Sequence, residues 1–408
     1  MNNRSVFFSK TSLLALLAAF TLAGTSCEKE DDVDAKADGP PTVTGLRAYA
    51  AAPNDSLITR VSPGTVIVIE GTKLKTTRAV LLDGYPATFN SALFADNSIV
   101  VNVPADIPFA SLDPALYNKI QVVTSGGETT YDFPVSAPAP VLSAASNEMA
   151  KPGETITITG NFLYLIKKIT FPGSVDATEF KANTGGTELQ VKVPQSTQAG
   201  PVRVQTEFGT TTSVFHMNDM AGTLLNFDNA NPFDYGCLVT NDASAFPGAN
   251  GKYARLMGEG IGNYNWSYDD GKRAIFSKQV DWLPASELNQ PAANYAMKFE
   301  IFVKEPLSTG CLFIGPPPGG SWAYMARYEP WKTTPNYKTA GWTTVSIPFD
   351  QFKLKANGAD GTGAGAATVN DLVGSINEVI KFMYVNDTAT PLAKLDIAVD
   401  NIRVVKIK

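Results

Sequence analysis

The sequence has 408 residues, of which 44% are hydrophobic and 18% charged, and this is the composition of a folded globular protein. Because the length exceeds what one ordinary hydrophobic core organises, we expect two to four domains. The net charge is −6, from 33 Lys and Arg residues against 39 Asp and Glu residues, and the basic residues form no long run. Nucleic-acid binding requires clustered positive charge, so this pattern argues against nucleic acid as a partner.

The N-terminus has the pattern of an export signal. Arg4 and Lys10 precede an apolar run, Leu13 to Ala23, which is shorter than the roughly 20 residues of a membrane-spanning helix. Small residues then lead to Cys27. This order resembles a bacterial lipoprotein signal, in which residues 1–26 are removed and Cys27 carries the lipid. The alternative is an ordinary exported protein in which Cys27 has no special role.

Residues 27–40 are expected to form a polar, acidic tether. The stretch CEKEDD, in which Lys29 precedes Glu30, Asp31 and Asp32, resembles the surface-export tag of Bacteroidetes lipoproteins. The resemblance implies a protein that is lipid-anchored in the outer membrane and exposed at the cell surface.

The remaining cysteines and the single histidine suggest no metal chemistry. Cys237 and Cys311 allow at most one disulfide bridge, and His216 has no partner in a Cys/His cluster. His216 stands at the end of an expected strand, where we interpret it as structural. The sequence therefore predicts neither a zinc site nor a cofactor.

One sequence pattern occurs twice. SPGTVIVIEGTKL (residues 62–74) aligns with KPGETITITGNFL (residues 151–163), and each copy continues into a second run of alternating apolar residues. Such alternation between Gly- and Pro-rich turns predicts antiparallel strands with one buried face, so each copy should be a small β-sandwich. The pattern resembles the immunoglobulin-like IPT/TIG domain, with copies at residues 41–137 and 138–218.

We interpret these two domains as spacers. They contain no tryptophan, and no pair of acidic residues recurs at matching positions. The proline-containing stretch SAPAP, residues 136–140, is expected to form a stiff joint between them.

Residues 219–408 contain all five tryptophans and nine of the 14 tyrosines. Apolar strand patterns recur there with almost no helical periodicity, which predicts a third all-β unit. GWTTVSIPF followed by the terminal DIAVDNIRVV resembles the jelly-roll sandwich of carbohydrate-binding modules. Many jelly-rolls bind a structural calcium ion, but no acidic cluster in this sequence specifies one.

The segment SWAYMARYEPW, residues 321–331, is the main candidate for binding. In a strand it would place Trp322, Tyr324 and Tyr328 on one face, with alternate residues about 6.6 Å apart, which is roughly the scale of one sugar ring. Sugar rings stack on aromatic faces through their C–H groups, and Trp and Tyr add a polar edge. A second aromatic loop, GIGNYNWSYDDGK, spans residues 260–272.

The candidate glycan-binding residues from the two segments are Trp331, Trp266, Trp322, Tyr324, Tyr264, Tyr328 and Arg327. Polar and proline neighbours favour exposure for Trp331 and Trp266, whereas Trp322, Tyr324, Tyr264 and Tyr328 could face either way. We expect Trp342 in the core, and Trp282 in the core or at a strand edge.

The order of these parts resembles the type B surface glycan-binding proteins of Bacteroidetes. The resemblance implies an all-β chain of two IPT/TIG sandwiches followed by a jelly-roll-like glycan-binding domain at residues 219–408. It also implies a non-catalytic protein that holds a β-glucan or xyloglucan near a SusC/SusD-like transporter and a surface glycoside hydrolase.

Two other classes of function stay open at this stage. A secreted glycoside hydrolase needs two carboxylates about 5 to 9.5 Å apart, and Glu259, Asp269, Asp270 and Glu329 lie in or near the aromatic segments. An adhesin would use the same aromatic residues to contact a protein.

Overall fold

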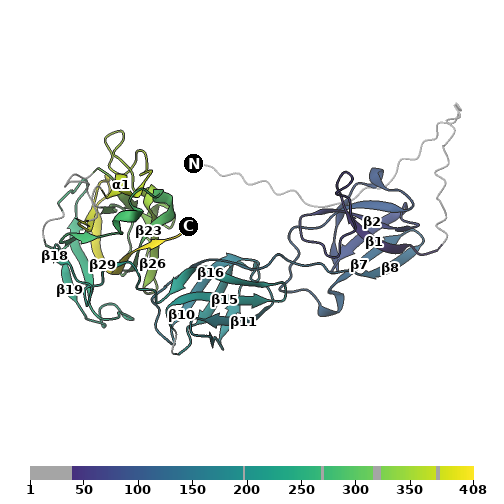
Figure 1. Cartoon of the computed structure of the whole chain (residues 1–408), viewed down its shortest axis with the longest axis horizontal. Coiled ribbons are helices and arrows are strands. Elements are labelled where there is room, and N and C mark those ends of the chain that lie inside the picture. The colour runs from purple at the N-terminus through teal and green to yellow at the C-terminus, as the bar shows by residue number, and fades with distance from the viewer. Residues whose placement is uncertain (1–38, 196–197, 268–270, 316–322, 374–376) are drawn as a thin grey trace, which may run out of the picture.

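The structure is a computed structural model that describes residues 39–195, 198–267, 271–315, 323–373 and 377–408. It consists of three β-sandwich units that follow one another in chain order, in an elongated arrangement (Figure 1). The prediction of an all-β protein is confirmed. None of the helices in the described residues is long and apolar enough to cross a membrane.

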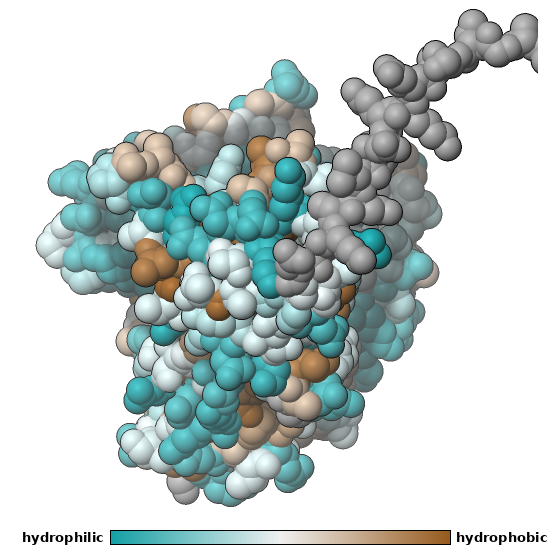
Figure 2. All heavy atoms as spheres, turned by 90° about the vertical axis from the view of Figure 1, so that its right-hand side faces the viewer, coloured by the Kyte–Doolittle hydropathy of each residue, from teal (hydrophilic) through white to brown (hydrophobic). Residues whose placement is uncertain are grey.

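The first unit has two four-stranded sheets, in the orders β1-β2-β6-β5 and β4-β3-β7-β8. Alternation builds its core: in β7, Ile120, Val122 and Thr124 are buried, while the residues between them are only partly so. The strands are β1 (Thr42–Ala48), β2 (Val66–Thr72), β3 (Thr77–Leu82), β4 (Tyr85–Pro86), β5 (Thr88–Phe89), β6 (Ser98–Asn102), β7 (Lys119–Thr124) and β8 (Gly127–Asp132). On the face turned to the viewer in Figure 2, the apolar residues of the described chain form small separate groups among hydrophilic ones.

The second unit repeats this design with the sheet orders β13-β14-β10-β9 and β12-β11-β15-β16. Ile158, Ile169 and Val204 are fully buried between the sheets. The strands are β9 (Val141–Ala145), β10 (Thr155–Asn161), β11 (Ile166–Phe171), β12 (Val175–Asp176), β13 (Phe180–Ala182), β14 (Glu188–Lys192), β15 (Gly200–Thr206) and β16 (Thr210–Met217). His216 lies near the end of β16 and its ring nitrogen is 3.1 Å from a carboxylate oxygen of Asp219.

The third unit is larger and packs a six-stranded sheet against a five-stranded one. The six-stranded sheet has the order β19-β20-β29-β23-β26, with β17 also paired to β29; the five-stranded sheet has the order β18-β21-β28-β24-β25, and β22 pairs with β27. The strands are β17 (Thr223–Leu225), β18 (Phe233–Tyr235), β19 (Leu238–Thr240), β20 (Tyr253–Ile261), β21 (Ala274–Ser277), β22 (Val280–Asp281), β23 (Tyr295–Val303), β24 (Cys311–Gly315), β25 (Ala326–Tyr328), β26 (Thr343–Pro348), β27 (Asn377–Glu378), β28 (Lys381–Val385) and β29 (Leu392–Lys406).

Helical segments are short throughout the described chain. The only α-helix among the described residues is α1 (Val369–Leu372), which begins with a capping box between Thr368 and Asp371. The 3-10 helices are η1 (Ser91–Leu93), η2 (Pro114–Leu116), η3 (Ala285–Glu287), η4 (Ala292–Asn294), η6 (Pro330–Lys332) and η7 (Phe349–Gln351).

The main core of the third unit lies between its two sheets. Phe299 of β23 meets Phe382 of β28 edge to face, with ring centroids 5.0 Å apart. Trp282, expected in the core or at a strand edge, is 2% exposed and lies in the core. Trp342 is only half-buried: it packs edge to face on Tyr253 at the outer side of the six-stranded sheet, instead of between the sheets. Cys237 and Cys311 are both free thiols, so the disulfide that the sequence allowed does not form.

Buried ion pairs join the second and third units. Glu148, in the loop between β9 and β10, lies 2.6 Å from the ammonium group of Lys298 and 2.9 Å from the guanidinium group of Arg403. Arg403 also pairs with Glu300 at 2.9 Å, and all four side chains are at least nine-tenths buried. Because isolated buried charges are costly, these pairs favour one fixed arrangement of the two units.

Candidate functional site

The segment at residues 323–331 does not form the aromatic row that its sequence suggested. Tyr328 lies on β25, and its ring points into the core, 6.2 Å from Phe299. Tyr324 is half-buried and also packs against that core. Trp322 lies outside the described residues. Since the inward face of β25 is occupied by the core of its own domain, Tyr328 is not free to stack on a ligand.

Trp331 is half-buried, and the expectation that it is exposed is wrong. It belongs to η6, and its indole N–H donates a hydrogen bond of 2.8 Å to the carbonyl oxygen of Gly310. Its ring packs against the edge of the core, and the ammonium group of Lys332 lies 5.8 Å from the ring centroid. This tryptophan holds η6 against the strand β24.

Trp266 is exposed as predicted, with half of its surface open to solvent. One face of its ring is stacked on Phe313, with centroids 6.2 Å apart and an angle of 23° between the ring planes. The neighbouring Tyr264 is also exposed. Its backbone N–H donates to the carbonyl of Thr388 at 2.9 Å, which fixes this loop on the sheet.

A second stacked pair was not predicted from the sequence. Tyr235 of β18 is half-exposed and lies almost parallel to Phe276 of β21, with centroids 4.7 Å apart and an interplanar angle of 11°. Tyr235 stands in NANPFDYGC, where it is the only tyrosine and no other aromatic pattern marks it. Only the pairing of β18 with β21 brings the two rings together.

Both stacked pairs lie on the outer side of the five-stranded sheet. Ile275, Leu312 and Phe382 point into the core. The alternate residues of the same strands form a separate apolar cluster on the other side, which comprises Ala274, Phe276, Cys311, Phe313, Met325, Met383 and Val385. We call the outer surface with Tyr235, Phe276, Phe313 and Arg327, together with the overlying Trp266, the aromatic face.

Arg327 supplies the polar edge of the aromatic face. Its guanidinium group lies 4.7 Å from the centroid of the Phe313 ring and makes hydrogen bonds of 2.9 and 2.8 Å to the carboxylate of Glu329. Asp387 accepts a further hydrogen bond from Arg327 at 2.5 Å through Oδ2. The other oxygen, Oδ1 of Asp387, is buried and has no hydrogen-bond partner among the described residues.

These charges leave Glu329 ionised. Burial opposes its ionisation, but hydrogen bonds from Arg327 and Lys332 outweigh burial and lower the pKa of Glu329 below its usual value. Of the other carboxylates suggested by the sequence, only Glu259 lies among the described residues, and it does not pair with Glu329. Glu259 is exposed on β20, in the opposite sheet, and Asp269 and Asp270 lie outside the described residues.

Residues 217–406 match a family model described as the surface glycan-binding protein B xyloglucan binding domain. The C-terminal domain belongs to this family. The aromatic face is thus the outer surface of one sheet of an SGBP-B domain.

A relative matches part of the chain. A Bacteroides ovatus protein described as IPT/TIG domain-containing is 31% identical over 158 residues, which are 38% of this chain and 31% of that protein. The match thus spans about a third of the length of that relative.

Two solved structures share the fold. The surface glycan-binding protein PbSGBP-B from Prevotella bryantii has a TM-score of 0.71 at 22% identity, and the match covers 91% of this chain and 100% of that one. An SGBP-B from a complex xyloglucan utilization locus in Bacteroides uniformis has a TM-score of 0.52 at 19% identity, with 90% and 99% covered.

Proposed function

We propose that this protein binds a polysaccharide of the β-glucan or xyloglucan class on the aromatic face and does not cleave it. The observation that carries the proposal is the pair of exposed rings, Tyr235 and Trp266, each backed by a buried phenylalanine on one surface of an SGBP-B domain. A ring that is held in place from behind loses little freedom when a sugar stacks on its front, so less of the stacking energy is spent on ordering.

The polar groups at the edge suit the hydroxyl groups of a sugar. Oδ1 of Asp387 is an acceptor without a partner in the described structure, and the ion pair with Arg327 holds this carboxylate in place. A hydroxyl donor from the glycan would satisfy this oxygen, which otherwise carries the cost of burial without a hydrogen bond.

The candidate residues from the sequence take different parts in this proposal. Trp266 and Tyr264 are exposed beside the sheet and are proposed to contact the glycan. Arg327 is proposed to position Asp387 and Glu329 at the edge. Trp331, Tyr324 and Tyr328 are proposed to support the sheet from behind or beside it.

Three features support binding without hydrolysis. The relatives with this fold are named as glycan-binding proteins. The carboxylates near Arg327 are held by a cation, whereas a general acid for glycoside hydrolysis needs a raised pKa. Glu259 lies on β20 of the six-stranded sheet, whereas Glu329 follows β25 of the five-stranded sheet, so the two carboxylates do not form a pair around one glycosidic bond.

The proposal includes the cellular setting that the N-terminus suggests. Lipidation at Cys27 and the acidic residues after it would place the protein on the outer membrane, facing outward. There it would hold glycan for a SusC/SusD-like transporter and a surface glycoside hydrolase.

The test is to incubate the full chain with soluble xyloglucan and mixed-linkage β-glucan, then measure both retention and products. We expect retardation in affinity gels that contain either polysaccharide, with no new reducing ends after prolonged incubation. Release of oligosaccharides would assign the protein to the hydrolases. Absence of retardation by both polysaccharides, and by a wider glycan panel, would favour the adhesin alternative.

A further inference from the structure

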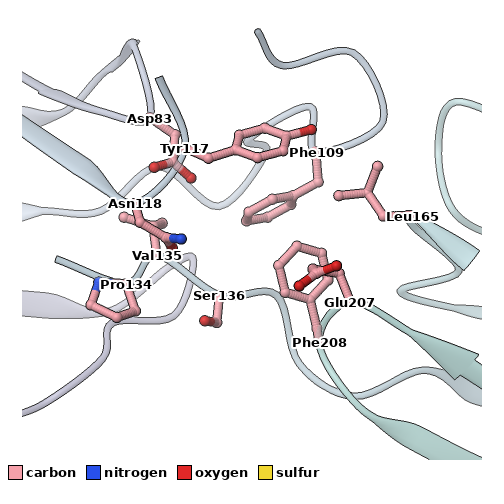
Figure 3. Close-up of a pocket in the computed structure, with 10 residues that line it drawn as sticks. All are labelled: Asp83, Phe109, Tyr117, Asn118, Pro134, Val135, Ser136, Leu165, Glu207 and Phe208. Atoms are coloured by element: carbon pink, nitrogen blue, oxygen red, sulfur yellow. The ribbon is translucent and has the colours of Figure 1, made fainter. Parts of the chain in front are cut away.

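The joint between the first and second units contains a hollow of about 420 Å³ (Figure 3). Side chains from both units line it: Asp83, Phe109, Tyr117, Asn118, Pro134, Val135 and Ser136 come from the first unit and the linker, and Leu165, Glu207 and Phe208 come from the second. A hollow of this size is within the range of small-molecule sites, which often lie between domains.

Three aromatic rings form one end of the hollow. Phe109 is 3% exposed and packs edge-on against Phe208 of the second unit, with centroids 5.1 Å apart. Tyr117 and Phe208 are half-buried, so part of each ring is open to the hollow, and Figure 3 shows both rings beside that of Phe109. Phe109 also packs against Tyr164 of the second unit, with ring centroids 5.7 Å apart, so this aromatic cluster contains residues of both units.

Asp83 brings a buried carboxylate to the same hollow. Its side chain is 2% exposed, and its Oδ1 accepts the backbone N–H of Lys119 at 3.3 Å. Burial raises the pKa of Asp83 to about 6.

The backbone around the hollow is held in an uncommon conformation. Asp83, Asn118 and Leu165 have φ values of +50°, +56° and +47°. Asp and Asn tolerate this region, but leucine rarely adopts it. Asp83 and Gly84 form the two-residue turn between β3 and β4, which requires a positive φ, so only Leu165 is held there against its usual preference.

A second hollow of about 410 Å³ adjoins the first and shares Pro134, Ser136, Glu207 and Phe208 with it. Its other lining residues are polar or small: Thr59, Arg60, Lys167, Gln205, Thr206, Gly209 and Thr210. The ammonium group of Lys167 lies 2.6 Å from the carboxylate of Glu207.

The charges of the two hollows balance. The charged side chains that line them are Asp83 and Glu207 on the negative side and Arg60 and Lys167 on the positive side. A ligand with a net charge of either sign therefore gains little over a neutral one. Aromatic walls at one end, with donors and acceptors along the rest, match a neutral ligand that has both C–H faces and hydroxyl groups.

We propose that this joint is a second saccharide site, which takes a short stretch of neutral glycan. One sugar ring lies against Tyr117, Phe109 and Phe208, and its hydroxyl groups bond to Asp83 and Ser136. The neighbouring sugar lies along Gln205, Arg60 and the threonines. The site is separate from the aromatic face, and a glycan in it contacts both units, so it also fixes the angle between them.

The test uses the full chain and a background in which the aromatic face is disabled by Tyr235→Ala together with Trp266→Ala. Calorimetric titration with a xyloglucan oligosaccharide and a mixed-linkage β-glucan oligosaccharide gives the number of sites and their affinities. We expect two sites per chain in the wild type and one in the background, for at least one of the two ligands. Adding Tyr117→Ala to the background should weaken the remaining site about 5- to 150-fold, the effect of losing one aromatic stack.

A second variant and a matched control keep the result interpretable. In Asp83→Asn the new side chain has nearly the same shape and keeps an oxygen that accepts the N–H of Lys119, so the fold should be preserved. This variant therefore tests the carboxylate even if Tyr117→Ala lowers stability. We expect at least tenfold weaker binding at the joint. Tyr49→Ala removes a 57% exposed tyrosine of the same unit and should change nothing.

The outcomes separate this inference from the proposed function. One site in the wild type and none in the background would overturn the joint site and leave the aromatic face intact. Residual binding that Tyr117→Ala and Asp83→Asn both leave unchanged would also overturn it. Two sites retained in the background would instead show that the aromatic face is not the first site.

Discussion

Tyr235 and Trp266 show how single residues set up the aromatic face. Each has one ring face in solvent and the other against a buried phenylalanine, Phe276 or Phe313. Burial of the phenylalanines and exposure of the rings above them are separate requirements. The phenylalanines are buried by the packing of the sheet, whereas the position of Tyr235 and Trp266 depends on the edge strand and the loop. The ring of Tyr235 or Trp266 can therefore be removed without opening the core.

We expect Trp266→Ala and Tyr235→Ala each to weaken binding of a β-glucan or xyloglucan oligosaccharide about 5- to 150-fold, because a stack on an aromatic ring contributes about 1–3 kcal/mol. The thermal midpoint should change little, since substitutions of exposed side chains usually stay within about 0.5 kcal/mol. Titration calorimetry and thermal melts measure both. Unchanged affinity in both variants would exclude the aromatic face as the binding site.

Asp400 predicts how stability depends on pH. Burial raises the pKa of this β29 carboxyl group to about 8, and the negative charges of Glu300 and Asp228 add to the effect. The pKa in the unfolded chain is near the ordinary 3.8. Protonated Asp400 therefore stabilises the fold fully below pH about 4, and this stabilisation is lost as the pH rises through 8.

We expect the melting temperature of the third unit to fall between about pH 4 and pH 8, the interval between the two pKa values of Asp400, and Asp400→Asn to flatten that decline. Asparagine keeps the oxygen that accepts the N–H of Asn401 at 2.7 Å. Tryptophan fluorescence reports this unit alone, because all five tryptophans lie after residue 218. Asp132→Asn, on the surface of the first unit, is the control. If the melting temperature of Asp400→Asn fell with pH as steeply as that of the wild type, Asp400 would not be the cause of the decline.

At the scale of elements, the five-stranded sheet and η6 form one structural piece. β24 pairs with β25 on one side and β28 on the other, and η6 follows β25 directly. Pro330 begins η6, where its missing N–H costs nothing, and Trp331 then bonds back to Gly310 just before β24. This bond closes the end of the sheet on which the aromatic face is built.

Trp331→Phe tests this structural role. Phenylalanine keeps an apolar ring but cannot donate to the carbonyl of Gly310, so we expect a loss of about 0.5–1.5 kcal/mol of unfolding free energy. Glycan affinity should stay within a factor of about two, because the ring is not proposed to touch the ligand. Chemical denaturation and calorimetry measure the two quantities. A large loss of affinity at unchanged stability would return Trp331 to the binding site.

At the scale of the whole molecule, we infer that the buried ion pairs hold the second and third units together as one rigid body. Glu148 comes from the second unit, whereas Lys298, Glu300 and Arg403 come from the third. Further hydrogen bonds cross the same boundary, including 2.7 Å from the N–H of Glu148 to the hydroxyl group of Thr344. The aromatic face is thereby held at a fixed orientation relative to the IPT/TIG-like domains.

Glu148→Ala should loosen this joint. The substitution removes one of the two carboxylates of this cluster, so Glu300 alone remains to balance the positive charges of Lys298 and Arg403. Breaking a buried ion pair typically costs about 3–5 kcal/mol of unfolding free energy. We expect faster proteolysis between the two units and a larger radius of gyration by small-angle scattering. Glu179→Ala breaks an exposed pair with Lys192 in the same unit and should change neither measurement. Equal behaviour of the two variants would show that the ion pairs do not hold the joint.

The proposed membrane anchor gives a prediction for the full chain in cells. Cys27→Ala should move the protein from the membrane fraction to the soluble fraction, because the apolar run before it is too short to span a bilayer. Alanine in place of residues 29–32 should leave the protein lipidated but protected from protease added to intact cells. Palmitate labelling of the Cys27→Ala protein would rule out this anchor.

The sequence by itself determined the all-β class and the kind of domain at the C-terminus. Strand alternation depends only on which residues must be buried, and this is written locally, as in Ile120 and Val122 of β7. Exposure of Trp266 was predictable for the same reason, since polar neighbours on both sides leave it no core to enter.

Only the tertiary structure decided which aromatic residues share a surface. Tyr235 and Phe276 lie 41 positions apart, and no motif in the sequence links them. The pairing of β18 with β21 brings their ring centroids to within 4.7 Å. Trp331 looked exposed from its neighbours, but its N–H donates to the carbonyl of Gly310, which lies 21 positions earlier, just before β24. Whether an aromatic ring faces core or solvent depends on contacts between distant strands, and the local sequence does not contain them.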